Sequence, residues 1–94
     1  MIKITFDYSK NRAVANDQGN QIGICSFNKH DKYWEINHTL VDQNYRGQGI
    51  ASLLVKEVVD KAREYNVRIL PVCSYAVKEF KTKSEYSDIL FEEI

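Results

Sequence analysis

The amino-acid sequence predicts an α/β fold, a mixed sheet whose antiparallel N-terminal strands are followed by a strand-helix-strand crossover and a short C-terminal helix. Three observations favour this fold class. Apolar and polar residues alternate with a period of two through the first half of the chain, as in a sheet with one buried face. The period lengthens to about 3.6 near Gly49, as in an amphipathic helix. A second apolar run, residues 67–73, follows that helix and supplies a further strand.

The first half is expected to form an antiparallel meander. Residues 16–20 combine Asn, Asp and Gly, which is typical of a tight hairpin turn. A polar loop at residues 29–32 marks the next reversal. These breaks predict four strands, at residues 2–6, 13–15, 21–28 and 33–41.

The last of these strands precedes the helix, so its faces matter for any site between the two. Side chains on a strand alternate between its faces. The sequence therefore predicts that one face carries Trp34, Ile36, His38 and Leu40.

The helix is expected to begin at Gly49 and to end near Asn66, a residue that can adopt the left-handed conformation of a helix terminus. Parallel strands need a long connection, so strand, helix and strand should form a right-handed crossover. Pro71 cannot donate a ladder hydrogen bond, and the strand that contains it should be poorly paired near its end or lie at an edge. Ser74 is expected to cap a short helix over residues 75–82.

Composition limits the functional classes. The chain has 94 residues, which suits one domain over residues 1–94, and its 13 basic residues balance 13 acidic ones. A nucleic-acid partner is therefore not favoured. No signal peptide or run of about 18 apolar residues is present, so we expect a cytoplasmic protein without a membrane partner. Cys25 and Cys73 lack metal-ligand spacing, which predicts two free thiols and no metal site.

Residues 45–51 read YRGQGIA and stand at the expected start of the helix. The first N–H groups of a helix lack intrahelical acceptors and form a positive dipole end. No Ser, Thr, Asp or Asn directly precedes Gly49 to cap them. Glycines permit a close approach of phosphate, and Arg46 adds charge. The stretch therefore indicates either an anion site or, as the structural alternative, a tight strand-to-helix turn.

Two common anion-binding loops do not fit this stretch. A P-loop needs Lys followed by Ser or Thr at the helix start, and neither pair stands at that position here. A dinucleotide fingerprint needs a third glycine, where this chain has Ser52, and an acid about twenty residues later, where it has Val67 and Arg68. Nucleoside triphosphate and NAD are therefore disfavoured as ligands.

The same stretch, followed by Leu53 and Leu54, resembles motif A of the GNAT superfamily of acetyl-CoA-dependent N-acetyltransferases. That motif reads Arg/Gln-x-x-Gly-x-Gly/Ala, and Arg46, Gly49 and Ala51 fill its fixed positions. The family also places this loop between its fourth strand and its main helix. With HTLV at residues 38–41 and PVCSY at residues 71–75, the whole chain looks like the small, single-domain members that lack the early helices.

The resemblance implies that acetyl-CoA is the co-substrate. Backbone amides of the loop would hold its diphosphate. In the family the strands on either side of the main helix splay apart, and the pantetheine arm pairs with the first of them like an extra strand. The cofactor-binding residues that follow from this are Leu40, Val41, Arg46, Gly47, Gln48, Gly49, Ile50 and Ala51.

Acetyl transfer to an amine needs a base or water relay, a polarised carbonyl and an acid for the departing thiolate. The family often uses a Glu on the central strands and a Tyr on the helix after the fifth strand, for which Glu35 and either Tyr75 or Tyr86 are candidates. In a second route His38 or a water would take the thiol proton of Cys73, which would then carry the acetyl group. Each residue also has a structural alternative, as a packing or surface side chain.

The resemblance thus implies an N-acetyltransferase that acts on a primary amine. Family members build the acceptor pocket from early helices and a long hairpin for which this chain is too short. The acceptor could therefore be a small molecule or a protein amine. The alternative is a non-catalytic acyl-CoA-binding or interaction module with the same fold.

Overall fold

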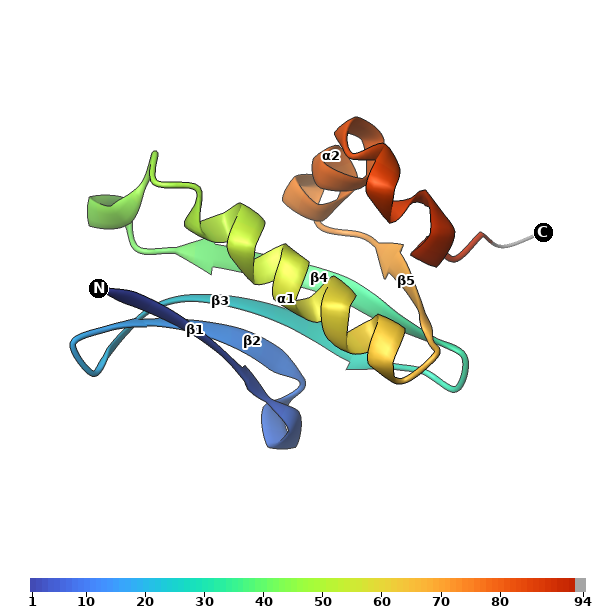
Figure 1. Ribbon diagram of the computed structural model, residues 1–94, viewed down its shortest axis with the longest axis horizontal. Coiled ribbons are helices and arrows are strands. Elements are labelled where there is room, and N and C mark those ends of the chain that lie inside the picture. Colours follow the sequence, from blue (N-terminus) through green and yellow to red (C-terminus); the bar gives the residue numbers. More distant parts are fainter. Residues whose placement is uncertain (93–94) are drawn as a thin grey trace.

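The computed structural model describes residues 1–92 and confirms the α/β fold class (Figure 1). Within these residues, one mixed sheet has the strand order β1-β2-β3-β4-β5, with bounds β1 (Ile2–Asp7), β2 (Arg12–Asp17), β3 (Asn20–Lys29), β4 (Tyr33–Val41) and β5 (Arg68–Pro71). The helices are α1 (Ile50–Glu64), α2 (Ser74–Thr82) and the short 3-10 helices η1 (Tyr8–Lys10), η2 (Gln43–Tyr45) and η3 (Ser84–Ile89).

The antiparallel meander of β1 to β4 is confirmed. The hairpin between β2 and β3 is tighter than the sequence predicts, because the strands continue to Asp17 and resume at Asn20. Gln18 and Gly19, which remain between them, have φ values of 51° and 83°. Two-residue hairpin turns of this kind require positive φ at both positions, which Gly tolerates best.

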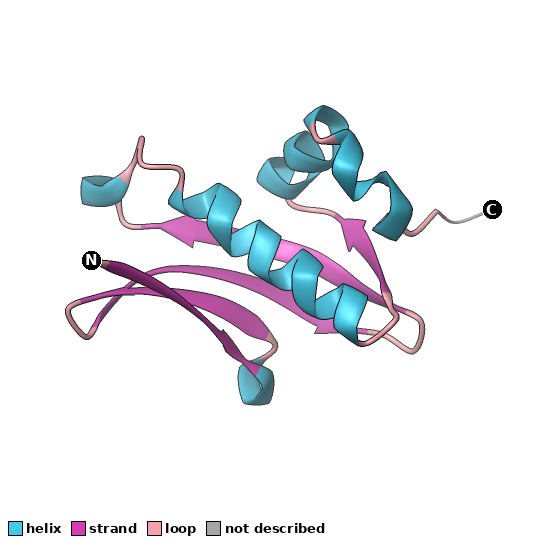
Figure 2. Ribbon diagram, in the orientation of Figure 1, coloured by secondary structure: helices cyan, strands magenta, loops and turns pink. Residues whose placement is uncertain are grey.

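α1 lies across one face of the sheet, and the core fills the space between them (Figure 2). Gly23 of β3 allows the close approach. A Cβ at this position would lie 3.2 Å from Cδ1 of Leu54 on α1 and 3.2 Å from the carbonyl oxygen of Leu40. The fully buried side chains come from both layers and include Ala13, Ala15, Cys25, Ile36, Leu54, Val55, Val58, Val59, Ala62 and Ile69.

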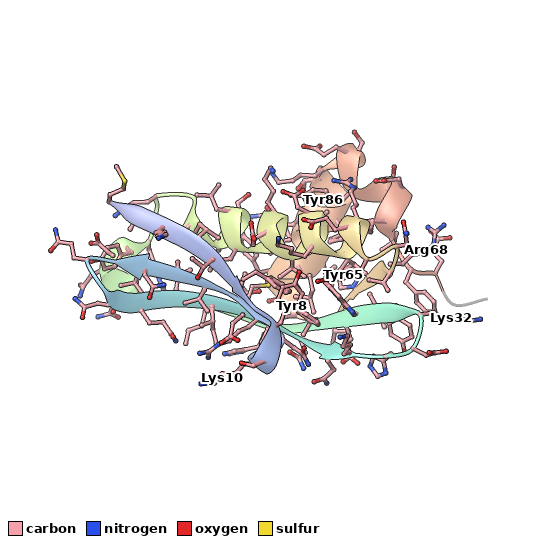
Figure 3. The ribbon with its side chains drawn as sticks, turned by 60° about the horizontal axis from the view of Figure 1, so that its bottom comes forward. Tyr8, Lys10, Lys32, Tyr65, Arg68 and Tyr86 are labelled. Atoms are coloured by element: carbon pink, nitrogen blue, oxygen red, sulfur yellow. The ribbon has the colours of Figure 1, made fainter. Side chains whose placement is uncertain are left out.

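Aromatic side chains cover the C-terminal end of α1. Tyr65, the C-terminal cap of the helix, meets Tyr8 edge to face with ring centroids 5.5 Å apart, and both rings are about half-exposed (Figure 3). The Tyr65 ring also packs near the Trp34 ring, with centroids 5.9 Å apart. Aromatic pairs in such geometries add to the energy of area burial, so this end of the helix is firmly attached to the sheet.

A β-bulge in β4 makes the predicted face assignment of that strand wrong. Phe27 of β3 pairs with Ile36, but the preceding residue, Ser26, pairs with His38, which leaves Asn37 as an extra residue. An extra residue reverses the alternation of side chains beyond it. Trp34 and Ile36 are buried as predicted, whereas Leu40 is 55% exposed and His38 is exposed.

The crossover from β4 through α1 to β5 is parallel, as predicted. Pairing with β5 covers only the first part of β4, from Tyr33 to Ile36, and the carbonyl oxygen of Ile36 then accepts from both Val72 N and Cys73 N. Pro71 is the last residue of β5, which agrees with the expected loss of pairing near it. In the described chain, residues 37–41 therefore extend beyond the end of β5 and a gap opens between the two strands.

α2 follows the gap and packs beside α1. The predicted cap at Ser74 is wrong, because the N-cap is Cys73, whose Sγ accepts a hydrogen bond from Ala76 N at 3.4 Å. Glu79 of α2 accepts a hydrogen bond from Ser52 Oγ of α1 at 3.0 Å. This contact joins the first turn of α1 to the middle of α2.

Candidate functional site

The segment from β4 to α1 is held in place by its own hydrogen bonds. Asp42 caps η2 by accepting from Asn44 N at 2.8 Å, and the hydroxyl of Tyr45 donates to Asp17 Oδ2 at 2.7 Å. The hydrogen bond from Tyr45 lowers the pKa of Asp17, and that from the N-terminal amine lowers it further. The loop is thereby attached to the C-terminal end of β2, and the sheet fixes its position.

The two glycines of the loop are required by the backbone. Gly47 and Gly49 have φ values of 82° and 74°, in the left-handed region that favours glycine. A Cβ at either position would meet no atom within 4 Å, so the space in front of the loop is open. Gly49 is the N-cap of α1, and no side chain caps the helix. The first-turn N–H groups of α1 therefore face an open space in which an anion can bind them.

A cleft of about 390 Å³ lies between this helix end, the last residues of β4 and α2. Its lining brings together seven of the eight predicted cofactor residues, all except Gln48, and one predicted catalytic residue, Tyr75. Among its lining residues, those from β4 are Thr39, Leu40 and Val41, those from the loop and α1 are Tyr45, Arg46, Gly47, Gly49, Ile50 and Ala51, and that from α2 is Tyr75.

A second hollow, of about 540 Å³, lies on the other side of the end of β4, against β3 and η2. Leu40, Val41 and Arg46 line both hollows, so the end of β4 separates them. Only the first hollow reaches the N-terminal residues of α1 and Tyr75. The glycine loop therefore opens into the hollow of about 390 Å³, and the name cleft refers to this hollow below.

Cys73 and His38 are not brought together, so the form of the second route in which His38 takes the thiol proton lacks the contact that it needs. The bulge turns Thr39, rather than His38, toward the core face of β4, and Thr39 Oγ1 lies 3.5 Å from Cys73 Sγ. The same oxygen lies 3.6 Å from Cys25 Sγ. Since neighbouring side chains on a strand point to opposite faces, His38 is directed away from Cys73. The neighbour of Cys73 that the sequence interpretation missed is thus Thr39.

The structure separates the two tyrosine candidates. Tyr75 lines the cleft, whereas Tyr86 is 4% exposed and packs with Phe80 at a centroid distance of 5.2 Å. Burial, followed by the nearby Glu79 carboxylate, raises the pKa of Tyr75, so its phenol stays protonated at neutral pH. Of the two tyrosines, Tyr75 is therefore the one that the structure brings to the cleft, with a protonated phenol.

Glu35 is engaged elsewhere. Its carboxylate lies 2.9 Å from His30 Nε2, and both residues are at the end of the sheet where β4 begins. The cleft is lined by the last residues of β4. On α2, sequence reasoning missed Glu79. Its carboxylate side chain belongs to a residue that is only 8% exposed and lies one helical turn from Tyr75. Its position in an apolar stripe at i+4 from Tyr75 was the available signal.

The described residues also bear on metal sites and on membrane-spanning helices. Among residues 1–92, no group of three or more His, Cys, Asp or Glu side chains could hold a metal ion. No helix in the same part of the chain is long and apolar enough to cross a membrane.

The sequence and the fold are similar to those of known proteins. The model of the GCN5-related N-acetyl-transferase family matches residues 12–89. No curated protein matches the chain. Among solved structures, a GCN5-like protein from Staphylococcus aureus, solved in solution, is similar with a TM-score of 0.75 and 28% identity, over 98% of this chain and 90% of the other.

Two larger proteins contain the same fold. The GNAT family N-acetyltransferase YhbS from Escherichia coli, in complex with CoA, is 28% identical with a TM-score of 0.64, over 80% of this chain and 43% of its own. The ribosomal-protein-alanine N-acetyltransferase from Brucella melitensis is 25% identical with a TM-score of 0.61, over 87% of this chain and 62% of its own. The chain therefore spans about half the length of these two proteins.

Proposed function

Because the chain belongs to the GCN5-related N-acetyl-transferase family, we propose that it binds acetyl-CoA and transfers the acetyl group to a primary amine in the cytoplasm. One observation carries the proposal. The uncapped, glycine-lined end of α1 opens into a cleft that continues along β4 to Tyr75. The similar YhbS structure contains CoA, which supports the choice of ligand. The whole sequence 1–94 would act as one domain.

Binding would divide between two parts of the cleft. The diphosphate accepts hydrogen bonds from backbone N–H groups between Arg46 and Ala51, and the Arg46 guanidinium adds charge. Beyond Ile36, β4 has no β5 partner, so the amide groups of the pantetheine arm can pair with residues near Leu40 and Val41 as an added strand does. The thioester would then lie beside Thr39 and Tyr75, both of which line the cleft.

In the direct route, the neutral amine nitrogen attacks the thioester carbonyl carbon. The C–N bond forms, the C–S bond to CoA breaks and the nitrogen loses a proton to water. The departing thiolate takes a proton from the Tyr75 hydroxyl, which the raised pKa keeps protonated.

The acyl-cysteine route uses Cys73 first. Its sulfur would accept the acetyl group and pass it to the amine in a second step. With His38 on the other face of β4, a water is the remaining proton acceptor of the two that the sequence suggested. Incubation with acetyl-CoA and intact-mass measurement separates the routes. An acetyl adduct that disappears in Cys73→Ala supports the second route, and absence of any adduct supports direct transfer.

Turnover distinguishes the proposed enzyme from a non-catalytic acyl-CoA-binding module. We expect free CoA thiol to appear when acetyl-CoA is mixed with a panel of small primary amines and lysine-containing peptides. Tyr75→Phe should slow this release about 10² to 10⁴-fold, as removal of a general acid does, while CoA still binds. Tyr86→Phe is the matched control, because its hydroxyl lies outside the cleft lining. Binding without release for every amine would favour the module.

A further inference from the structure

The hydroxyl of Thr39 lies between the two cysteine sulfur atoms of the chain. Oγ1 donates to Cys25 Sγ at 3.6 Å and lies 3.5 Å from Cys73 Sγ, where either atom can be the donor. Thr39 also lines the cleft beside Leu40 and Val41. This side chain therefore connects the cleft directly with both thiols.

The two thiols have different environments. Cys25 is fully buried, and burial raises its pKa to about 12, so that it remains protonated. Cys73 is half-buried, at the point where β5 ends and α2 begins, and Ala76 N donates to its sulfur. Cys73 is not among the residues that line the cleft, but it is the less buried of the two thiols, and its sulfur lies 3.5 Å from the hydroxyl of Thr39, which does line it.

A hydroxyl carries one proton and rotates to suit its partners. While Cys73 is a thiol, its S–H can donate to Thr39 Oγ1, and the Thr39 O–H donates to Cys25 Sγ. Once Cys73 has lost its proton it can only accept. The Thr39 O–H then turns toward Cys73 and donates to it, beside the N–H of Ala76. Cys25 would thus accept the hydrogen bond of the Thr39 hydroxyl as long as Cys73 is protonated.

We propose that Thr39 is a positioning residue for acetyl transfer through Cys73. The inference rests on the proposed function and on its acyl-cysteine route. In that step a bond forms between the Cys73 sulfur and the acetyl carbonyl carbon, the C–S bond to CoA breaks, and the thiol proton ends on the CoA sulfur. Thr39 holds the Cys73 sulfur beside the cleft and stabilises its anion by a hydrogen bond.

The test measures the reactivity of Cys73 without any acyl-CoA. Iodoacetamide alkylates the thiolate, and intact mass followed by peptide mapping gives the rate at Cys73 at one fixed pH. Thr39→Val keeps the branched shape but removes the hydroxyl, and should slow alkylation about tenfold, the effect of losing one hydrogen bond to a charged group. Thr39→Ser keeps the hydroxyl and should restore a rate close to that of the unchanged protein.

Equal rates for the unchanged protein and Thr39→Val would overturn the proposal. So would a Thr39→Ser rate as low as that of Thr39→Val, because shape rather than the hydroxyl would then control Cys73. Thr39→Ala is a second hydroxyl-free variant in case Thr39→Val fails to fold, and Cys73→Ser identifies the labelled thiol. The probe is iodoacetamide alone. A failure of acetyl-CoA binding would therefore overturn the proposed function, but the alkylation rates at Cys73 could still be interpreted.

Discussion

At the scale of single residues, the loop before α1 depends on backbone conformation more than on side chains. Gly47 and Gly49 have positive φ, and the space that a Cβ would occupy is open at both. A side chain at Gly49 would therefore cost conformational energy and also project into the cleft. These two effects can be separated, because Gly19 has a φ of 83° and equally open space but lies in the hairpin between β2 and β3.

We expect Gly49→Ala and Gly19→Ala each to lower the free energy of unfolding by about 1–2 kcal/mol, the cost of a left-handed alanine. Only Gly49→Ala should also weaken CoA binding, measured by isothermal titration calorimetry. Urea denaturation gives the stability change. Equal CoA affinity in the two variants would show that the loop does not approach the ligand closely.

The site residues differ in how well the sequence indicates them. Arg46, Gly47 and Gly49 are recognisable because they stand where a helix begins without a capping side chain. The first backbone N–H groups of such a helix lack acceptors, and this can be read from the sequence. Thr39 was not recognisable as the neighbour of Cys73, because strict alternation assigns it to the opposite face. The bulge at Asn37 reverses that assignment, and its position depends on pairing with β3. The polar run at residues 37–39, inside the strand and between apolar residues on either side, was the available sign of irregularity.

At the scale of elements, α1 and α2 are joined by a buried polar contact at the edge of the cleft. Glu79 is 8% exposed and accepts from Ser52 Oγ at 3.0 Å, while Lys83 Nζ lies 3.9 Å from the same carboxylate oxygen. Buried charge is costly unless it is paired and hydrogen-bonded. The position of α2, and with it that of Tyr75, therefore depends on this contact.

Removal of the Ser52 hydroxyl should lower the free energy of unfolding. Ser52→Ala leaves the buried carboxylate short of a hydrogen bond and should cost about 1–3 kcal/mol in urea denaturation. In the Ser52→Ala background, Glu79→Gln should recover part of the loss, because a neutral amide is cheaper to bury than a carboxylate. An unchanged midpoint for Ser52→Ala would mean that water replaces the serine hydroxyl.

The elements themselves were predictable where periodicity is long and regular. β4 and α1 follow from their patterns, and the left-handed conformation of Asn66 marks the helix end. The cap of α2 was missed, since Ser is a far commoner N-cap than Cys. The sulfur of Cys73 takes that role because the chain turns sharply after pairing with Ile36. Such tertiary constraints are not visible in local sequence.

At the scale of the whole molecule, two buried acidic groups limit stability at high pH. Burial raises the pKa of Cys25 from 9.0 to about 12 and that of Tyr86 from 10.0 to about 12. Above pH 9 the unfolded chain begins to lose these protons while the folded protein retains them. Their contribution to stability is therefore complete below about pH 9 and is lost as the pH rises toward 12.

We accordingly expect the free energy of unfolding, measured by urea denaturation at each pH, to fall steadily between pH 9 and pH 12. Cys25→Ala should be less stable at neutral pH, because it leaves a cavity, but should lose less stability over the alkaline range. Parallel pH profiles for the two proteins would contradict the assignment of the alkaline loss to Cys25.

The architecture of the whole molecule follows from the order of its parts. An antiparallel meander followed by a parallel crossover was predictable, and so was loss of pairing near Pro71. The extent of the gap was not, because it depends on where β5 ends relative to β4. In the described chain that end leaves residues 37–41 without a β5 partner, and residues 39–41 of this segment line the cleft.

The central claim is that the N-terminal end of α1 binds the diphosphate of coenzyme A. Titration of the isotope-labelled protein with coenzyme A, followed by backbone amide NMR, tests it most directly. We predict large, saturable shifts for the amides of Gly47, Gly49 and Ala51, with small shifts at Asn66, which lies beyond the opposite end of α1. Loop amides that remain unmoved at saturating coenzyme A, or shifts confined to the hollow between β3 and η2, would contradict the account.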